Sequence, residues 1–378
     1  MSFDFGTRRD DFPVTKNLIY LNHAAVAPLP RPAADALRWY ADDAMNWGSF
    51  HYPEWMAACE GIRSELSQMI GCGTNEVALV KNTSEGIATI QMGIDWKPGD
   101  VVVAFKEEFP ANYYCWKLLE ERSGCVVRWL SLYDSLDKID EACRGARLLA
   151  ISWVNYLSGF RVDLQAIGEI CKRHNVFYFV DAIQGLGAFP LDVKACGIHA
   201  LASDGHKWLL GPEGWGVLYV DQTVQDQVFP VEFGWTTVKH WPDYSSRDMT
   251  LRPDAGRYEP GTLNVAGSFA LRASMNLLNQ ATIPAVSQQV LALADRLDQG
   301  LRQLGCELMV DRLPSNSSGI LSFRKDRVDS VRLHAELKAR KILSAPRQGW
   351  VRFSPHFYLE LAEMDAVIDA VRDSLKTI

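Results

Sequence analysis

Short apolar runs alternate with amphipathic segments through the first part of the chain. The runs are EVALV (76–80), VVVAF (101–105), VVRWLSL (126–132), RLLAISWV (147–154), VFYFVDA (176–182), HALAS (199–203) and GVLYV (216–220). Helical patterns separate them at 84–94, 112–123, 135–143 and 163–174. Apolar strands that alternate with helices are typical of a mostly parallel sheet covered on both faces. The pattern therefore predicts an α/β fold with a large, doubly wound sheet.

The pattern changes after about residue 220. A loop-rich stretch with tryptophans and prolines precedes long helices expected at 265–280 and 284–304, strands at 318–324 and 349–354, and a last helix at 363–376. We interpret this part as a smaller α+β domain. The predicted division is a large domain over 20–260 and a small C-terminal domain over 261–378, which also takes in 1–19. Residues that select a substrate are expected in loops at 45–55 and 233–245.

Composition and charge narrow the class of protein. The 378 residues are 48% hydrophobic and 22% charged, which is ordinary for a globular protein. The formal net charge of −7 and the lack of a basic stripe argue against nucleic acid as a partner. No apolar stretch suggests a membrane partner or a signal peptide, so a cytoplasmic location is expected. The eight cysteines show no zinc spacing, so no metal site is predicted.

Polar residues follow two neighbouring apolar runs. Asp181 ends VFYFVD, and Asp204, His206 and Lys207 follow HALAS. Asp181 alone is equally well explained as a turn cap, and a lone lysine is usually a solvated surface residue. Ligands of open parallel sheets, however, bind beyond the carboxyl ends of the strands. The apolar neighbours of Lys207 would desolvate its amine and lower its pKa, which favours a neutral amine available for a Schiff base.

A third segment fits the same edge of the sheet. In VKNTSEGIATI, Thr83 and Ser84 stand where a strand ends and a helix begins. The free N–H groups and dipole of a helix start bind phosphate, and the two hydroxyls add donors. An ordinary helix cap is the alternative explanation.

The segments NTSEG (82–86), VDAIQ (180–184) and SDGHK (203–207) together resemble the class V aminotransferase family of pyridoxal 5'-phosphate (PLP) enzymes. This family includes cysteine desulfurases, cystine lyases, kynureninase and isopenicillin-N epimerase. The similarity runs from YLNHAAVAPLP (20–30) to VRFSPHFY (351–358). The resemblance implies the PLP-dependent transferase fold, fold type I, with a large and a small domain, and a homodimer.

The resemblance also implies roles for individual residues at the cofactor. Lys207 would form the Schiff base with PLP, Asp181 would pair with the pyridine nitrogen, and Gln184 would approach the ring hydroxyl. The phosphate would be held by Thr83, Ser84 and His206. Phe109, in EEFPANYY, would stack on the ring, and Thr262, in EPGTLN, would reach the phosphate bound by the other subunit.

Four residues are candidates for substrate binding. Arg352, in GWVRFS, would pair in a bidentate, charge-assisted way with the substrate carboxylate, although an ordinary surface arginine is the alternative. Asn155 and Tyr156 match a family segment near the ring, and which of them makes contact is left open. His23 resembles a segment that lines the substrate site, but it is equally well explained as a structural histidine in a turn.

The chain also departs from its relatives. KILSAPRQGW (341–350) lacks the nucleophilic cysteine that desulfurases carry before the carboxylate-binding arginine, so a persulfide-forming desulfurase is not expected. Phe109 replaces a histidine, and it can pack on the ring but cannot move protons. A carboxylate at Asp204 would repel a phosphate, so this side chain is expected to face His206 or Arg257.

The expected activity is PLP-dependent chemistry on an α-amino acid, in which Lys207 removes the Cα proton. Transamination is the first expectation because it needs only Lys207 to return that proton, and a keto acid would then be a possible second substrate. One alternative is an epimerase or racemase, which needs a second acid such as His23 or Tyr156. Another is a β-eliminating or C–S lyase, which needs a leaving group on the substrate. A non-catalytic PLP-fold binding protein is a further alternative.

Overall fold

A seven-stranded sheet forms the centre of the computed structural model, which describes residues 8–378. Its strand order is β2-β8-β7-β6-β5-β3-β4. The strands are β2 (Val77–Val80), β3 (Val101–Phe105), β4 (Val126–Leu130), β5 (Leu148–Ser152), β6 (Phe177–Asp181), β7 (Ala200–Asp204) and β8 (Gly216–Val220). Strand β8 is antiparallel to both of its neighbours, and the neighbouring strands from β4 to β7 are parallel. The mostly parallel sheet predicted from the apolar runs is confirmed.

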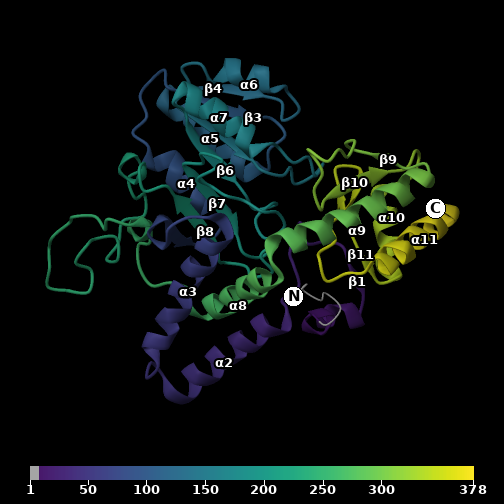
Figure 1. Cartoon of the computed structure of the whole chain (residues 1–378), viewed down its shortest axis with the longest axis horizontal. Coiled ribbons are helices and arrows are strands. Elements are labelled where there is room, and N and C mark those ends of the chain that lie inside the picture. Colours follow the sequence, from purple (N-terminus) through teal and green to yellow (C-terminus); the bar gives the residue numbers. More distant parts are fainter. Residues whose placement is uncertain (1–7) are drawn as a thin grey trace.

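Helices cover both faces of this sheet (Figure 1). Consecutive strand residues point to opposite faces, and apolar side chains pack on both faces. Val102, for example, packs in a cluster with Trp116 of α5 (Pro110–Ser123), whereas Val103 packs in a second cluster with Ile167 of α7 (Leu164–His174). Helix α4 (Thr83–Gly93) lies on the first face, and α6 (Leu136–Cys143) lies on the second. Burial on both faces explains why most of the strands are apolar runs rather than alternating, and edge strand β4, with a half-buried Arg128, is the exception.

A second, antiparallel sheet lies in the C-terminal part of the chain. Its order is β12-β13-β10-β9, with β9 (Glu307–Leu308), β10 (Leu321–Arg324), β12 (Ala345–Arg347) and β13 (Trp350–Phe353). The helices here are α9 (Ile283–Gln303), α10 (Ser330–Ala339) and α11 (Leu361–Thr377). Strand β1 (Ile19–Tyr20) pairs with β11 (Ile342–Leu343), which brings the N-terminal segment back to this part. The domain division near residue 260 stays a prediction, and residues 1–7 lie outside the described part.

Two long helices that the sequence patterns did not predict precede the first strand of the large sheet. They are α2 (Arg31–Trp47) and α3 (Tyr52–Ile70), and both pack against α8 (Val265–Ala281). The prediction of a loop over 45–55 is therefore wrong, because only residues 48–51 connect the two helices. Pro32 and Pro53 stand in the first turns, and Gly48 and Gly71 stand at the C-caps with positive φ, which are ordinary helix boundaries. No helix among the described residues has the length and apolar character needed to cross a membrane.

A buried ion pair joins α3 to the segment that carries Thr262. Two nitrogens of Arg63 donate to the carboxylate of Glu259 at 2.7 and 2.8 Å. The same carboxylate accepts the backbone N–H of Leu79 at 2.7 Å, and Arg63 donates to the carbonyl of Val77 at 2.6 Å. The pair thus anchors the start of residues 259–264 to edge strand β2.

Breaking this pair from one side should destabilise the protein strongly. Arg63→Met leaves the Glu259 carboxylate buried without its cation, and such losses cost about 3–5 kcal/mol. We expect a clear drop in the urea midpoint of unfolding. The matched control is Arg324→Met, because Arg324 pairs with Glu307 at 2.7 Å on the exposed surface, where a pair contributes up to about 1 kcal/mol. Equal losses in the two variants would contradict the structural role of the buried pair.

Candidate active site

Three strand ends bring polar side chains to one edge of the large sheet. Ser152 ends β5, Asp181 ends β6 and Asp204 ends β7. Ser152 is paired in register with Asp181, and Asp181 with Ala202 of β7. The carboxyl ends of these parallel strands therefore form one ligand-facing edge, as the sequence predicted.

The carboxylate of Asp181 is buried at this edge. Its Oδ1 accepts the backbone N–H of Ile183 at 3.0 Å. Burial raises the pKa of Asp181 to about 6, and the positive charge of Lys207 acts in the opposite direction. A buried carboxylate with an unused oxygen facing a cation is suited to hold a protonated ring nitrogen.

Lys207 lies in the turn that follows β7 and is 9% exposed. Desolvation lowers the pKa of its amine to about 8, and the charge of Arg352 adds to this effect against the attraction of Asp181. The Lys207 Nζ lies 5.6 Å from the ring centroid of Phe109. The next residue, Trp208, fixes the turn, since its indole N–H donates to Gln184 at 2.9 Å and its carbonyl lies 3.2 Å from Nε2 of His356. The lysine is thus held near an aromatic face as an amine that loses its proton at lower pH than a solvated lysine does.

The start of helix α4 offers an unsatisfied hydroxyl. Thr83 is the first residue of α4, and its Oγ1 is buried without a hydrogen-bond partner. Asn82 caps the helix by accepting the N–H of Glu85 at 2.9 Å, so the hydroxyls of Thr83 and Ser84 are not needed as caps. A buried hydroxyl at a helix N-terminus fits a phosphate group.

Asp204 faces His206, one of the two partners considered from the sequence. Oδ1 of Asp204 lies 2.9 Å from Nδ1 of His206, although the alignment is not that of a good hydrogen bond. Arg257, the other partner considered, pairs with Asp226 at 2.8 Å instead. The Asp204 carboxylate therefore lies against the His206 ring and not against Arg257, a cation of another segment.

Arg352 presents a buried guanidinium that has no carboxylate partner among residues 8–378. Its Nη1 donates to the carbonyl of Tyr156 at 2.5 Å, and its Nε has no hydrogen-bond partner. Burial lowers the pKa of Arg352 to about 10, and the nearby charge of Arg347 lowers it further. A buried cation with an unsatisfied N–H fits an anionic ligand such as an amino-acid carboxylate.

Phe109 and the loop after β5 lie beside this cation. The Phe109 ring is exposed and meets the Tyr156 ring edge-to-face at 5.3 Å. The Tyr156 hydroxyl accepts Nε2 of Gln348 at 3.0 Å, which ties the loop to the β12–β13 turn. Asn155 uses its Oδ1 for Ser158 and donates from Nδ2 to the Glu107 carbonyl at 2.8 Å. In this arrangement Asn155 shapes the loop, and Tyr156 presents a ring toward Phe109.

Gln184 and His23 are both committed to protein partners. Gln184 donates to the carbonyl of Ala24 at 2.9 Å in addition to its bond with Trp208. His23 is fully buried, with Nδ1 2.8 Å from the Ser354 carbonyl and Nε2 2.8 Å from the Tyr358 hydroxyl. Neither ring nitrogen of His23 is free for a substrate in this arrangement.

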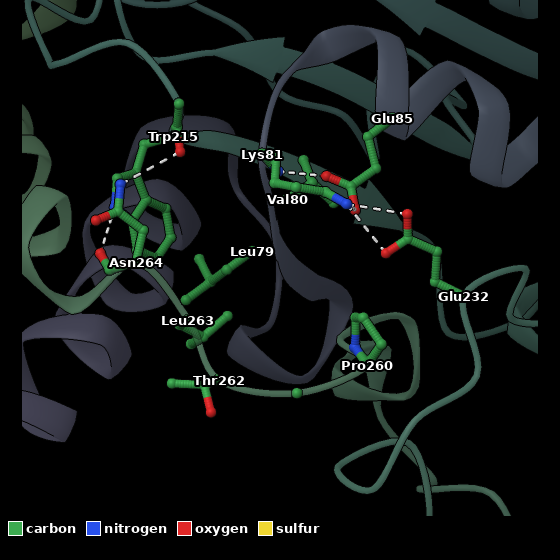
Figure 2. Close-up of a pocket in the computed structure, with 12 residues that line it drawn as sticks. Leu79, Val80, Lys81, Glu85, Trp215, Glu232, Pro260, Thr262, Leu263 and Asn264 are labelled. Atoms are coloured by element: carbon green, nitrogen blue, oxygen red, sulfur yellow. Dashed lines mark hydrogen bonds and ion pairs between the residues drawn. The ribbon is translucent and has the colours of Figure 1, made fainter.

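Thr262 lies in a different place. It lines a pocket of about 260 Å³ with residues of β2 and the start of α4, next to the ion pairs of Lys81 with Glu232 and Glu85 (Figure 2). The Thr262 side chain is exposed, and Lys207 and Asp181 do not line this pocket. The structure therefore does not bring Thr262 to the site of its own chain.

The sequence reasoning missed two charged residues at the site. Arg347, in KILSAPRQGW, acts electrostatically on both Lys207 and Arg352, and it forms no ion pair within the described part of the chain. Glu108, in EEFPANYY, is buried, and the charge of Asp181 acts on its carboxyl group. Both residues lie in segments that the sequence analysis considered for other reasons. Their closeness in sequence to a candidate site residue was the signal that could have identified them.

The fold and the site together define a class of protein, the PLP-dependent enzymes of fold type I. The chain matches the family model "Aminotransferase class-V" over residues 19–349, and it belongs to that family. It is 30% identical over 334 residues to a probable cysteine desulfurase of Methanothermobacter thermautotrophicus, covering 85% of this chain and 81% of the relative.

Solved structures share the fold over nearly the whole chain. The apo cysteine desulfurase of Thermococcus onnurineus NA1 superposes with a TM-score of 0.91 at 23% identity and covers 100% of both chains. The cystine C–S lyase C-DES, in complex with its product cysteine persulfide, has a TM-score of 0.88 at 22% identity and covers 96% of this chain and 99% of its own. A C-DES variant has been solved with glycine covalently linked to its PLP cofactor. PLP is the cofactor of this family, and the residues above fit it.

The lowered pKa of Lys207 predicts how PLP uptake depends on pH. Since the neutral amine attacks the PLP aldehyde, the rate of uptake by the cofactor-free protein should rise up to about pH 8 and level off above it. A solvated lysine would keep raising the rate to about pH 10.4. Stopped-flow absorbance of the lysine-bound cofactor measures this, and Lys207→Ala should show no such signal. A rate still rising steeply above pH 9 would contradict the assignment.

Proposed function

We propose that this protein is a PLP-dependent C–S lyase, which removes the sulfur substituent of a cysteine-type amino acid by β-elimination. The observation that carries the proposal is a site with a buried lysine of lowered pKa and a buried, unpaired Arg352, but without a cysteine in the segment 341–350. The family relatives named as desulfurases and as a C–S lyase support cleavage at sulfur more than transamination, which was the first expectation.

Arg352, Asp181 and Lys207 each have a separate role in the proposed reaction. Arg352 binds the substrate carboxylate, with Arg347 adding positive charge near it. Bound PLP supplies an electron sink for the bond broken at Cα, and Asp181 keeps its ring nitrogen protonated. The Lys207 amine takes the Cα proton, and the Cβ–S bond then breaks with its electron pair leaving on sulfur. Sulfur departs as a thiol or persulfide, and hydrolysis of the remainder gives pyruvate and ammonia.

The alternatives fit the site less well. An epimerase needs an acid on the face opposite Lys207. Of the two candidates, His23 is fully buried with both nitrogens engaged, so an epimerase would depend on Tyr156, whose hydroxyl accepts a hydrogen bond from Gln348. A protein-bound persulfide needs a nearby thiol, and KILSAPRQGW contains none. β-Elimination needs neither a second acid nor a nearby thiol from the protein.

A cavity beside Tyr156 supports a substrate with a substituent on sulfur. Its volume is about 520 Å³, and it lies between the loops after β3 and β5 and the β12–β13 turn. Tyr113, Tyr114 and Tyr133 line it together with Tyr156 and Gln348. Free cysteine would leave most of this space empty, whereas a disulfide such as cystine could extend into it.

The holoenzyme should therefore consume L-cystine without any keto acid. We expect pyruvate and ammonia in equal amounts, with a persulfide as the sulfur product, measured by a coupled pyruvate assay and cyanolysis. Lys207→Ala should abolish turnover, because the base is lost. Stoichiometric conversion of the cofactor to its amine form, or inversion of the substrate at Cα, would instead establish transamination or epimerisation.

We also propose that the enzyme is a homodimer in which Thr262 reaches the phosphate bound by the partner subunit. Three observations support this. Thr262 is exposed and lines a pocket (Figure 2) that Lys207 and Asp181 of its own chain do not line. The family resemblance implies the shared site. Exposed aromatic side chains, including Trp47, Phe50, Trp235 and Tyr244, offer apolar surface that a partner would cover.

Thr262→Val should weaken PLP binding even though its hydroxyl lies outside the site of its own chain. Loss of one hydrogen bond to a phosphate predicts a Kd about three- to tenfold higher, measured by equilibrium binding of PLP alongside light scattering for the dimer mass. Thr74→Val is the matched control, since Thr74 is also exposed and lines neither pocket described above. A monomeric holoenzyme, or an unchanged Kd in Thr262→Val, would contradict the shared site.

A further inference from the structure

Glu108 places a second buried carboxyl group at the Asp181 edge of the sheet. Glu108 lies between the end of β3 and Phe109, and its side chain contacts Ser152 at the end of β5. The backbone N–H of Ser152 donates to Oε1 at 2.6 Å, and the Ser152 hydroxyl donates to Oε2. Both carboxyl oxygens are therefore fixed from the end of β5.

This contact connects Glu108 to Asp181. Ser152 is paired in register with Asp181, so one residue lies between the two carboxyl groups across the sheet. The carboxamide of Asn112, in the first turn of α5, also faces Glu108, and its Nδ2 has no other hydrogen-bond partner. Glu108 thus joins the end of β5 to the start of the helix that follows Phe109.

The electrostatic surroundings of Glu108 are acidic. Asp181 and the thiol of Cys115 face it, and Lys207 and Asp204 face Asp181 in turn. Burial, with a smaller contribution from the charge of Asp181, raises the pKa of Glu108 to about 7. Since the pKa of Asp181 is about 6, Asp181 ionises first as the pH rises and Glu108 follows near neutral pH.

We propose that Glu108 is a positioning residue of the cofactor site, which holds Ser152 beside Asp181 and, when ionised, adds negative charge behind the Asp181–pyridine contact. The added charge strengthens the hold on a protonated ring nitrogen. This role rests on the PLP site and not on the choice of reaction, so it applies equally to a lyase and to a transaminase.

The test is a pH titration of the cofactor absorption in the Glu108→Gln holoenzyme. The substitution keeps an acceptor for the Ser152 N–H but removes the negative charge. Without that charge the protonated cofactor is held less strongly, so the pH at which half of the cofactor absorption has changed should fall by roughly 0.5–1 pH unit. Glu107→Gln is the matched control, because the Glu107 carboxylate is held in the same way, by the Ser131 hydroxyl at 2.9 Å and the Leu132 N–H at 2.8 Å. Its midpoint should equal that of the wild type.

A midpoint in Glu108→Gln equal to that of Glu107→Gln would overturn the proposal, whatever the enzyme's reaction proves to be. Infrared titration of the full-length wild-type protein before PLP is added gives a test that does not depend on the variant folding. A protonated carboxyl band should disappear with a midpoint of about 7. A protonated carboxyl band that persists above about pH 9 would rule out the proposed role, because Glu108 would then carry no negative charge.

Discussion

The burial of charges that lack partners of opposite sign is the constraint on which this site depends. Arg352 is buried with an unsatisfied Nε, and Lys207 and Asp181 attract each other without forming an ion pair within 4.0 Å. Uncompensated buried charges cost several kcal/mol, and proteins commonly neutralise them through pKa shifts. The pKa values of about 8 for Lys207 and about 6 for Asp181 follow from this cost. PLP would bring charged partners to Asp181 and Lys207, and the carboxylate of the proposed substrate would bring one to Arg352, so binding would reduce this cost.

The two sheets contribute different parts of this arrangement. The large sheet supplies Asp181 and Lys207 at the ends of adjacent strands, and it can do so because parallel strands end at the same edge. The antiparallel sheet supplies Arg352 on β13. The two meet where Arg352 donates to the Tyr156 carbonyl and Gln348 donates to the Tyr156 hydroxyl. The loop after β5 is therefore the structural link between the cofactor edge and Arg352.

Local sequence patterns were sufficient for the large sheet, because every strand except edge strand β4 is largely buried on both faces and appears as an apolar run. They also placed Asp181 and Lys207 correctly at neighbouring strand ends. The patterns did not predict α2 and α3, although prolines in their first turns and glycines at their C-caps mark the ends of both helices. They could not reveal the Glu108–Ser152 contact, which joins residues 44 positions apart. The burial of His23 depends likewise on Ser354 and Tyr358, which are more than 300 positions away.

The choice of reaction depends less on the catalytic groups than on what surrounds the substrate. Lyases and transaminases of this kind share the removal of the Cα proton, and the proposed role of Lys207 would serve both. Phe109, whose ring centroid lies 5.6 Å from Lys207 Nζ, cannot carry a proton. Elimination needs only a leaving group on Cβ and space for it to depart. The cavity lined by Tyr113, Tyr133 and Tyr156 lies at the loop whose Tyr156 carbonyl accepts a hydrogen bond from Arg352, and the proposed lyase would use it as the space for the leaving group.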